Sequence, residues 1–251
     1  MNLLLDLGNT RIKWALADQG CRAAGLAIVQ RGVARYEAAE LASLQQQLSA
    51  ANIRQVQYAS VIDTEQEKTV VAALLPEGVQ VRRFRVAQQA GSLSNAYATP
   101  ETLGVDRWAA AVGAWGLCGE ACLVISAGTA TTIDLIETTA SGNAIYRGGL
   151  IVPGMDLMLQ SLHQRAARLP LAAGRYRAAP DVADNTHDAI RSGALEATAG
   201  AIERMGQRLP VGAPWLITGG AAPLLQEVLG DRVRFVEDLV LAGLALELDD
   251  R

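Results

Sequence analysis

Short apolar runs and amphipathic stretches alternate along the chain in an order that occurs twice. In the first half, helical spacing of alanine and leucine predicts two helices, at 36–48 and 64–75. The second helix begins at Thr64, Glu67 three residues later predicts a capping box, and Pro76 ends the helix. Apolar runs predict strands at 2–7, 11–18, 25–30, 55–62 and 79–86.

The second half repeats this order. Strands are predicted at 121–128, 131–138, 144–154, 214–220 and 233–237, with helices from about residue 155 and at 186–209, 222–230 and 239–248. Three adjacent strands followed by alternating helix and strand are typical of α/β domains with mixed sheets. Because residues 99–117 predict a helical crossing, we expect two domains, at 1–117 and 118–251.

One strand and the turn after it also occur twice. "LLDLGNTRIKWAL" at 4–16 aligns with "LVISAGTATTIDL" at 123–135, so that Gly8 meets Gly128 and Asp6 meets Ser126. A strand that ends in such a turn and returns at once forms a tight hairpin, in which Gly8 tolerates positive φ or close backbone approach. The second copy keeps the glycine but lacks the acid.

These turns carry the chemistry of a phosphate site. The exposed amides at Gly8 can point at an anion, Asn9 and Thr10 add side-chain donors, and Lys13 supplies positive charge. Asp6 suits a hydrated Mg²⁺ held mainly by nucleotide phosphates. Taken alone, the same residues are also ordinary hairpin formers.

Two further turns extend this chemistry into the second half. Gly128, Thr129 and Thr131 repeat the donors of the first turn, so two phosphate loops could face one another across a cleft. In the turn "ITGGAAP", Gly219 and Gly220 would let a base or ribose lie against the backbone. Three such turns at strand ends favour a nucleotide-binding protein.

Composition and charge narrow the function classes. Half of the 251 residues are hydrophobic, and the net charge of -4 comes without a basic cluster, so nucleic acid is a poor first candidate for a partner. Cys21, Cys118 and Cys122 form no C-x-x-C pair, which favours a reducing cytosol. Since no apolar run approaches the roughly 18 residues of a membrane span, we expect a cytoplasmic protein without membrane contact.

These motifs resemble those of the acetate and sugar kinase, Hsp70 and actin superfamily. Within it, the chain resembles the type III pantothenate kinase family, also known as Bvg accessory factors. The resemblance spans nearly the whole chain. It is carried by "DLGNTRIKWAL", "NAYATPETLGVDRW", "GTATTID", "GGLIVPGMDLMLQSLHQRAARLP" and "NTHDAIRSGALEATAGAIERM". The element G-x-D-R after N-x-Y-x-x-P-x-x-L is the most specific, because other branches of the superfamily do not share it.

The resemblance implies an α/β fold of two ribonuclease-H-like domains, as in actin-like ATPases. Each would be a mixed five-stranded sheet flanked by helices, with an interdomain cleft. It further implies transfer of the ATP γ-phosphoryl group to the primary hydroxyl of pantothenate, with Mg²⁺ and a monovalent cation, K⁺ or NH₄⁺. The resemblance also implies a homodimer whose pantothenate pocket lies near the dimer interface.

The resemblance also implies residue roles. Asp106 would be the general base, and Asp6 would serve the metal through water. Pantothenate would be held by Tyr97, Gly104, Val105, Asp106, Arg107 and Thr186. ATP and its phosphates would be bound by Asp6, Leu7, Gly8, Asn9, Thr10, Arg11, Lys13, Gly128, Thr129, Ala130, Thr131, Gly219 and Gly220.

The chain departs from the family pattern at Ser126, where D-x-G-T-A-x-T usually begins with aspartate. A serine offers a neutral oxygen in place of a carboxylate, which puts the monovalent-cation site in doubt. Three alternatives stay open: "GVDR" as a helix-surface ion pair, a non-catalytic transcription-accessory regulator, and another small-metabolite kinase or phosphatase. Asp106, Arg107 and Lys13, retained together with the three glycine turns, favour catalysis over a scaffold.

Overall fold

The structure is a computed structural model that describes residues 1–18, 28–75, 78–139, 141–165 and 174–249. These residues form two units, each with its own network of internal contacts. The first unit comprises 1–119, 138–146 and the chain from residue 238 onward, and the second comprises 120–137 and 147–237. Each unit consists of a sheet with helices packed on it.

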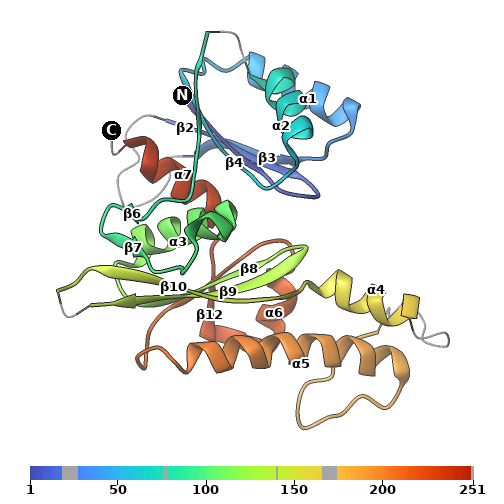
Figure 1. Cartoon of the computed structure of the whole chain (residues 1–251). Helices are drawn as coiled ribbons and strands as arrows, with labels where there is room; N and C mark the ends of the chain where they lie inside the picture. Colours follow the sequence, from blue (N-terminus) through green and yellow to red (C-terminus); the bar gives the residue numbers. More distant parts are fainter. Residues whose placement is uncertain (19–27, 76–77, 140, 166–173, 250–251) are drawn as a thin grey trace. The chain divides into compact units, whose positions relative to one another are not determined.

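A five-stranded sheet, in the order β3-β2-β1-β4-β5, forms the centre of the first unit (Figure 1). Strands β1 to β3 are antiparallel neighbours, whereas β4 runs parallel to β1 and β5 runs parallel to β4. The elements of this unit are β1 (Asn2–Leu7), β2 (Ile12–Ala17), β3 (Ile28–Ala34), α1 (Ala38–Ser49), β4 (Gln55–Ser60), α2 (Thr64–Leu74), β5 (Gln80–Arg83), β6 (Gln89–Ala90), β7 (Leu93–Asn95), a 3₁₀ turn (Pro100–Thr102), α3 (Val105–Cys118) and α7 (Leu239–Asp249).

Helices cover the sheet of the first unit because β1 is apolar on both faces. Leu3, Leu5 and Leu7 pack with α1 and α2, and α7 contacts β1, β2 and β4. Helices α3 and α7 lie against each other at glycines. A Cβ on Gly243 would lie 1.9 Å from the Ala109 carbonyl oxygen, so the two backbones approach too closely for any side chain there.

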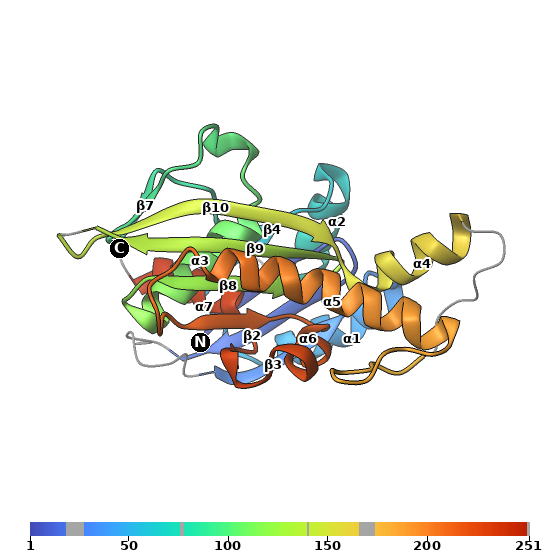
Figure 2. The same ribbon diagram turned by 90° about the horizontal axis from the view of Figure 1, so that it is seen from below.

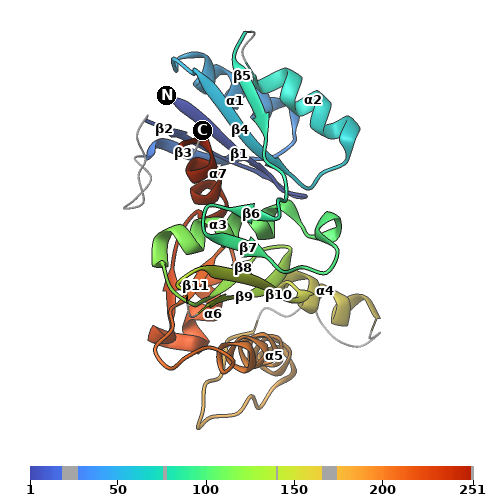
Figure 3. The ribbon, with the colours of Figure 1, turned by 60° about the vertical axis from the view of Figure 1, so that its left-hand side comes forward.

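The second unit contains most of a seven-stranded sheet in the order β12-β11-β8-β9-β10-β7-β6. Figures 2 and 3 show α5 and α6 on one side of its strands, and their apolar residues form one core with β8, β9 and β11. The elements are β8 (Cys122–Ala127), β9 (Ala130–Thr138), β10 (Ala144–Pro153), α4 (Met155–Arg165), α5 (Thr186–Gly206), β11 (Trp215–Thr218), α6 (Ala222–Leu229), a 3₁₀ turn (Gly230–Arg232) and β12 (Val233–Phe235).

The observed elements match the predicted ones in type and order, with two differences. The second sheet has seven strands rather than the expected five, because the short hairpin β6–β7 pairs with the start of β10. The predicted capping box at Thr64 is wrong. The N-cap is Asp63, whose Oδ1 accepts hydrogen bonds of 3.0 Å from the Glu65 and Gln66 amides.

Glu67 is unavailable for a capping box because it is 7% exposed and serves a network inside the unit. Its Oε1 accepts a 3.0 Å hydrogen bond from the Tyr58 hydroxyl, and its Oε2 lies 2.9 Å from Arg83 Nη2. Cys21, Pro76 and the first residues of the predicted strand 25–30 lie outside the described residues. Within the described part of the chain, no helix is long and apolar enough to cross a membrane.

Candidate active site

The turn between β1 and β2 is a tight loop of four residues at the carboxyl end of β1. The Gly8 amide donates a 3.1 Å hydrogen bond to the Arg11 carbonyl oxygen, which closes the turn. Gly8 does not have positive φ, but a Cβ there would lie 3.3 Å from the same oxygen, so close approach is the reason for glycine. Asn9 and Thr10 are exposed at the tip. The loop therefore presents backbone and side-chain donors to solvent, as an anion site requires.

Asp6 is the acidic residue in β1 two positions before this loop, and it is 9% exposed. Burial raises the pKa of its carboxyl to about 6. Lys13, its cross-strand partner, opposes that rise, while the negative charges of Asp106 and Asp238 add to it. Since all of these groups belong to the first unit, they concentrate negative charge at one end of its sheet. Oxygen donors in a negative field fit a hydrated Mg²⁺.

Tyr36 contacts the same loop from the segment between β3 and α1. Its hydroxyl donates a 2.6 Å hydrogen bond to the Gly8 carbonyl oxygen. Burial, and after it the charge of Asp6, raises the pKa of Tyr36 to about 12. The hydroxyl is therefore a protonated donor at neutral pH.

The G-x-D-R element forms the start of α3. Gly104 is the N-cap, and Asp106 Oδ1 accepts a 2.9 Å hydrogen bond from the Arg107 amide. A Cβ on Gly104 would lie 2.6 Å from that oxygen, so a side chain there would displace the carboxylate from this position. Arg107 is 5% exposed, with its guanidinium 5.7 Å from the centre of the Tyr97 ring. The interpretation of "GVDR" as a helix-surface ion pair is therefore wrong, because the arginine is buried.

The N-x-Y element holds Tyr97 in place beside Arg107. The Asn95 side chain donates to the Ala87 carbonyl oxygen over 3.1 Å and accepts from the Tyr97 amide over 3.0 Å. Tyr97 lies 6.4 Å, and Trp108 5.8 Å edge-on, from the ring of Tyr146, which is fully buried. Asparagine here shapes the backbone, and the aromatic rings fix the surroundings of the arginine.

The second unit places its two predicted turns at the ends of β8 and β11. The Gly128 amide donates to the Ala130 carbonyl oxygen over 3.0 Å, and Gly128 and Thr129 are exposed. Thr131 is fully buried, so its side chain is not a surface donor. Gly219 has φ +102, and a Cβ there would lie 2.3 Å from the Ala127 carbonyl oxygen, so this turn requires glycine.

Thr186 is the first residue of α5, and it lies on the wall of a groove in the second unit. Asn185 caps the helix by accepting a 3.0 Å hydrogen bond from the Asp188 amide. The groove has a volume of about 810 Å³, and Met158, Leu162 and Ile190 contribute apolar walls. Thr186 thus adds a hydroxyl to the rim of a mainly apolar surface.

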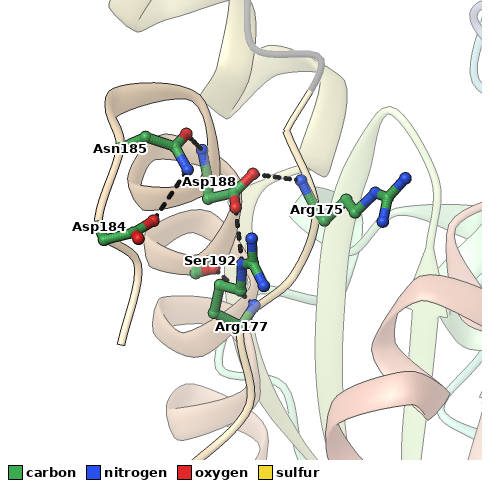
Figure 4. Close-up of polar contacts among 6 residues, drawn as sticks. All are labelled: Arg175, Arg177, Asp184, Asn185, Asp188 and Ser192. Atoms are coloured by element: carbon green, nitrogen blue, oxygen red, sulfur yellow. Dashed lines mark hydrogen bonds and ion pairs between the residues drawn. The ribbon is translucent and has the colours of Figure 1, made fainter. Parts of the chain in front are cut away.

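Asp188 ties the segment before α5 onto the helix (Figure 4). Its carboxylate accepts 2.7 Å hydrogen bonds from the Arg175 amide and from Arg177 Nε, and the Arg177 amide donates to Ser192 Oγ over 3.0 Å. The Arg175 amide first, and then Arg177, lowers the pKa of Asp188 to about 2. This cluster holds the segment 175–177 against the first turns of α5, the helix that begins with Thr186.

Comparison with known proteins agrees with this arrangement. The family model for type III pantothenate kinase matches residues 2–208. A type III pantothenate kinase of Aromatoleum aromaticum is 42% identical, over 98% of this chain and 97% of that protein. Another, of Azoarcus sp. strain BH72, is 41% identical over 98% of this chain and 90% of that protein.

The chain belongs to the type III pantothenate kinase family. Solved structures of distant proteins agree on the fold. A putative 2-dehydro-3-deoxygalactonokinase of Sinorhizobium meliloti gives a TM-score of 0.57 at 13% identity, covering 100% of this chain and 96% of that one. The activator of the 2-hydroxyisocaproyl-CoA dehydratase of Clostridium difficile gives 0.56 at 12%, covering 99% and 94%. The fold is thus the mixed α/β architecture of duplicated ribonuclease-H-like domains expected for the family.

Within this family member, the structure groups the predicted residues by unit. The first unit brings Asp6, Lys13 and Asp106 into one electrostatic neighbourhood and sets Arg107 against Tyr97. Val105 faces a pocket of about 510 Å³ in the same unit. The first unit also holds the other predicted residues of the β1–β2 turn and Gly104, and the second unit holds its own at three of its turns, around Gly128, around Gly219 and at the start of α5.

Sequence reasoning missed several residues that contact or influence the candidate site. Tyr36, Tyr146 and Asp238 carry no motif of their own, and each acts on a predicted site residue that is distant in sequence. Asp188 and Arg177 lie in or near a quoted motif, but helical periodicity does not reveal their pairing across 11 residues. A weak signal existed for Asp188, because it is an acid in the first turn of a predicted helix.

We predict that the Asp188 cluster stabilises the protein only where its carboxylate is ionised. Because the folded pKa of about 2 lies below the ordinary 3.8, this stabilisation is complete above pH of about 4 and is lost as the pH falls toward 2. Asp188→Asn should therefore lower the melting temperature most at pH 7, and the gap to wild type should narrow below pH 4. Asp231→Asn, at an exposed aspartate of the same unit, is the control. A gap that stays constant down to pH 2.5 would contradict the assignment.

Proposed function

We propose that the chain transfers the γ-phosphoryl group of ATP to the primary hydroxyl of pantothenate, giving 4′-phosphopantothenate in the cytoplasm, the first committed step toward coenzyme A. The observation that carries this proposal is the start of α3. There, Gly104 makes room for the Asp106 carboxylate, and buried Arg107 lies beside Tyr97. Family membership over nearly the full chain supports the same reaction.

In the proposed mechanism, Asp106 is the general base. The pantothenate hydroxyl oxygen attacks the γ-phosphorus, the bond from that phosphorus to the oxygen bridging to the β-phosphate breaks, and the hydroxyl proton passes to Asp106. Phosphoryl transfer depends on in-line positioning and neutralised charge, so a positioned carboxylate and surrounding donors suffice. Mg²⁺ would neutralise phosphate charge, with Asp6 holding it through water. Lys13, opposite Asp6 in the hairpin, adds positive charge beside the loop.

The other residues divide between the two substrates. Arg107 offers planar donors for the pantothenate carboxylate, with Tyr97 packed beside it. Gly104, Val105 and Thr186 complete the proposed pantothenate set. The proposed ATP set consists of Asp6, Leu7, Gly8, Asn9, Thr10, Arg11, Lys13, Gly128, Thr129, Ala130, Thr131, Gly219 and Gly220, in which Thr131 acts through its backbone because its side chain is buried.

Replacing Asp106 tests the general base. Asp106→Asn keeps an oxygen for the Arg107 amide but removes the base, so kcat should fall by about 10²–10⁴-fold with an unchanged circular dichroism spectrum. Glu101→Gln, at an exposed carboxylate five positions earlier, should keep wild-type kcat. The measurement is ADP release coupled to a spectrophotometric assay. A variant that retains most of its kcat would refute the role of Asp106, and a wild type without pantothenate-dependent ADP release would favour the non-catalytic regulator.

The proposal includes weak binding of a monovalent cation, K⁺ or NH₄⁺, near Ser126. This residue is half-buried at the end of β8, and its register partners on both sides are the neutral Thr132 and Thr218. A neutral hydroxyl attracts a cation less than a carboxylate does. Higher salt should therefore be needed for activation.

We predict that Ser126→Asp lowers the KCl concentration for half-maximal activity and leaves the KM for pantothenate nearly unchanged. Ser126→Ala is the matched control, because it removes the oxygen without adding charge. KCl is titrated against the initial rate for all three proteins. Superimposable curves for wild type and Ser126→Asp would mean that this position does not govern the cation.

The proposal also includes a homodimer that uses the groove of the second unit. Large apolar side chains are exposed on α4 and the segments near it: Leu150 (40%), Ile151 (62%), Leu157 (43%), Leu162 (42%) and Val182 (83%). Exposed apolar side chains favour association, and a closed two-fold dimer is the commonest outcome for identical chains.

We predict that the active enzyme sediments at about twice the 26.5 kDa chain mass. Leu162→Glu places a charge on the groove wall and should shift the protein toward monomer. Val211→Glu, at a fully exposed residue elsewhere in the same unit, should remain dimeric. Sedimentation velocity at assay concentration measures both. A fully active wild-type monomer would refute the dimer.

A further inference from the structure

Tyr36 is hydrogen-bonded to the β1–β2 turn, Gly8 to Arg11, although it lies 28 residues from Gly8 in the sequence. Its ring packs against the apolar core of the first unit, so the hydroxyl is held in one place by the fold. From there it donates a 2.6 Å hydrogen bond to the Gly8 carbonyl oxygen. The acceptor is thus the first carbonyl of the loop that carries Asn9 and Thr10.

The hydrogen bond from Tyr36 also fixes the direction of the Asn9 N–H. The Gly8–Asn9 peptide bond is trans, and in a trans peptide the carbonyl and the following amide point in opposite directions. Because the Gly8 oxygen points at Tyr36, the Asn9 N–H is directed away from Tyr36. The Gly8 N–H is already used by the Arg11 carbonyl oxygen, so the Asn9 amide is the next backbone donor of the loop.

This peptide is also free of side-chain restriction on its Gly8 side. Gly8 has no Cβ to restrict its backbone, and Asn9 is exposed at the tip of the loop. A rotated peptide would turn the Gly8 carbonyl oxygen toward the place of the Asn9 amide and present a negative dipole to an incoming phosphate. A donor from outside the loop that holds the carbonyl prevents this rotation.

We propose that Tyr36 is a positioning residue for nucleotide phosphate: its hydroxyl holds the Gly8 carbonyl so that the Asn9 amide stays oriented toward the phosphates of ATP. The inference rests on the proposed function for its kinetic effect. Its effect on nucleotide binding stands apart from the identity of the acceptor substrate.

The test is Tyr36→Phe, which removes the hydroxyl and keeps the ring. We expect the KM for ATP to rise by about 3- to 10-fold, the range for losing one hydrogen bond, while the KM for pantothenate stays unchanged. Tyr58→Phe is the matched control, because Tyr58 donates its hydroxyl over 3.0 Å to Glu67 in the same unit. It should lower the melting temperature without moving the KM for ATP. Equal KM values for Tyr36→Phe and wild type would overturn the proposal.

Direct binding separates this inference from the proposed reaction. Calorimetry with Mg²⁺ compares a non-hydrolysable ATP analogue with adenosine, which lacks phosphates. Tyr36→Phe should weaken binding of the analogue and leave adenosine unaffected. This result would stand even if the wild type did not phosphorylate pantothenate. An equal loss for both ligands would assign Tyr36 a general structural role and refute the proposal.

Discussion

The burial of one carboxylate at the end of β1 is the constraint on which the site of the first unit depends. Every residue of β1 is buried. Asp6, near the carboxyl end of this central strand, therefore has little water around it, and its pKa rises to about 6. Nearby positive charge favours the ionised form. Lys13 supplies part of it across the hairpin, and the remaining deficit makes the position suited to a cation brought in by a ligand.

Close backbone contacts bring the other carboxylates near Asp6. Helix α7 packs on α3 through Gly113 and Gly243, where any side chain would strike the opposing backbone. Asp238 immediately precedes α7 and Asp106 lies in the first turn of α3, so the packing of these helices in one unit places both charges where they act on Asp6. Arg31 lies 3.5 Å from Asp238 and offsets part of its charge. The small residues between α3 and α7 thereby determine which charges act on Asp6.

The sequence predicts most helices and strands because periodicity is local, and the candidate site residues that it proposes are those that belong to a motif. What it does not predict depends on contacts between distant segments. Asp63 and Thr64 are both good N-caps, and the burial of Glu67 against Tyr58 decides between them. The bond from Tyr36 to Gly8 leaves no local signal, because either residue alone suits many environments. The hairpin β6–β7 is too short to show alternation.

The two copies of the strand and turn differ in both loop geometry and charge. The first loop, Gly8 to Arg11, is closed by the Gly8 amide on the Arg11 carbonyl oxygen, whereas the shorter second loop, Gly128 and Thr129, has the Gly128 amide on the Ala130 carbonyl oxygen. In the first copy, Asp6 lies opposite Lys13, so an acid is paired with a base across the hairpin. In the second, Ser126 lies opposite Thr132, and its other neighbour is Thr218. An aspartate at Ser126 would have no cation in register, and its partial burial would penalise the charge. The second hairpin therefore lacks both the acid and the base that lie opposite each other in the first, so the first hairpin carries a charged pair and the second a neutral one.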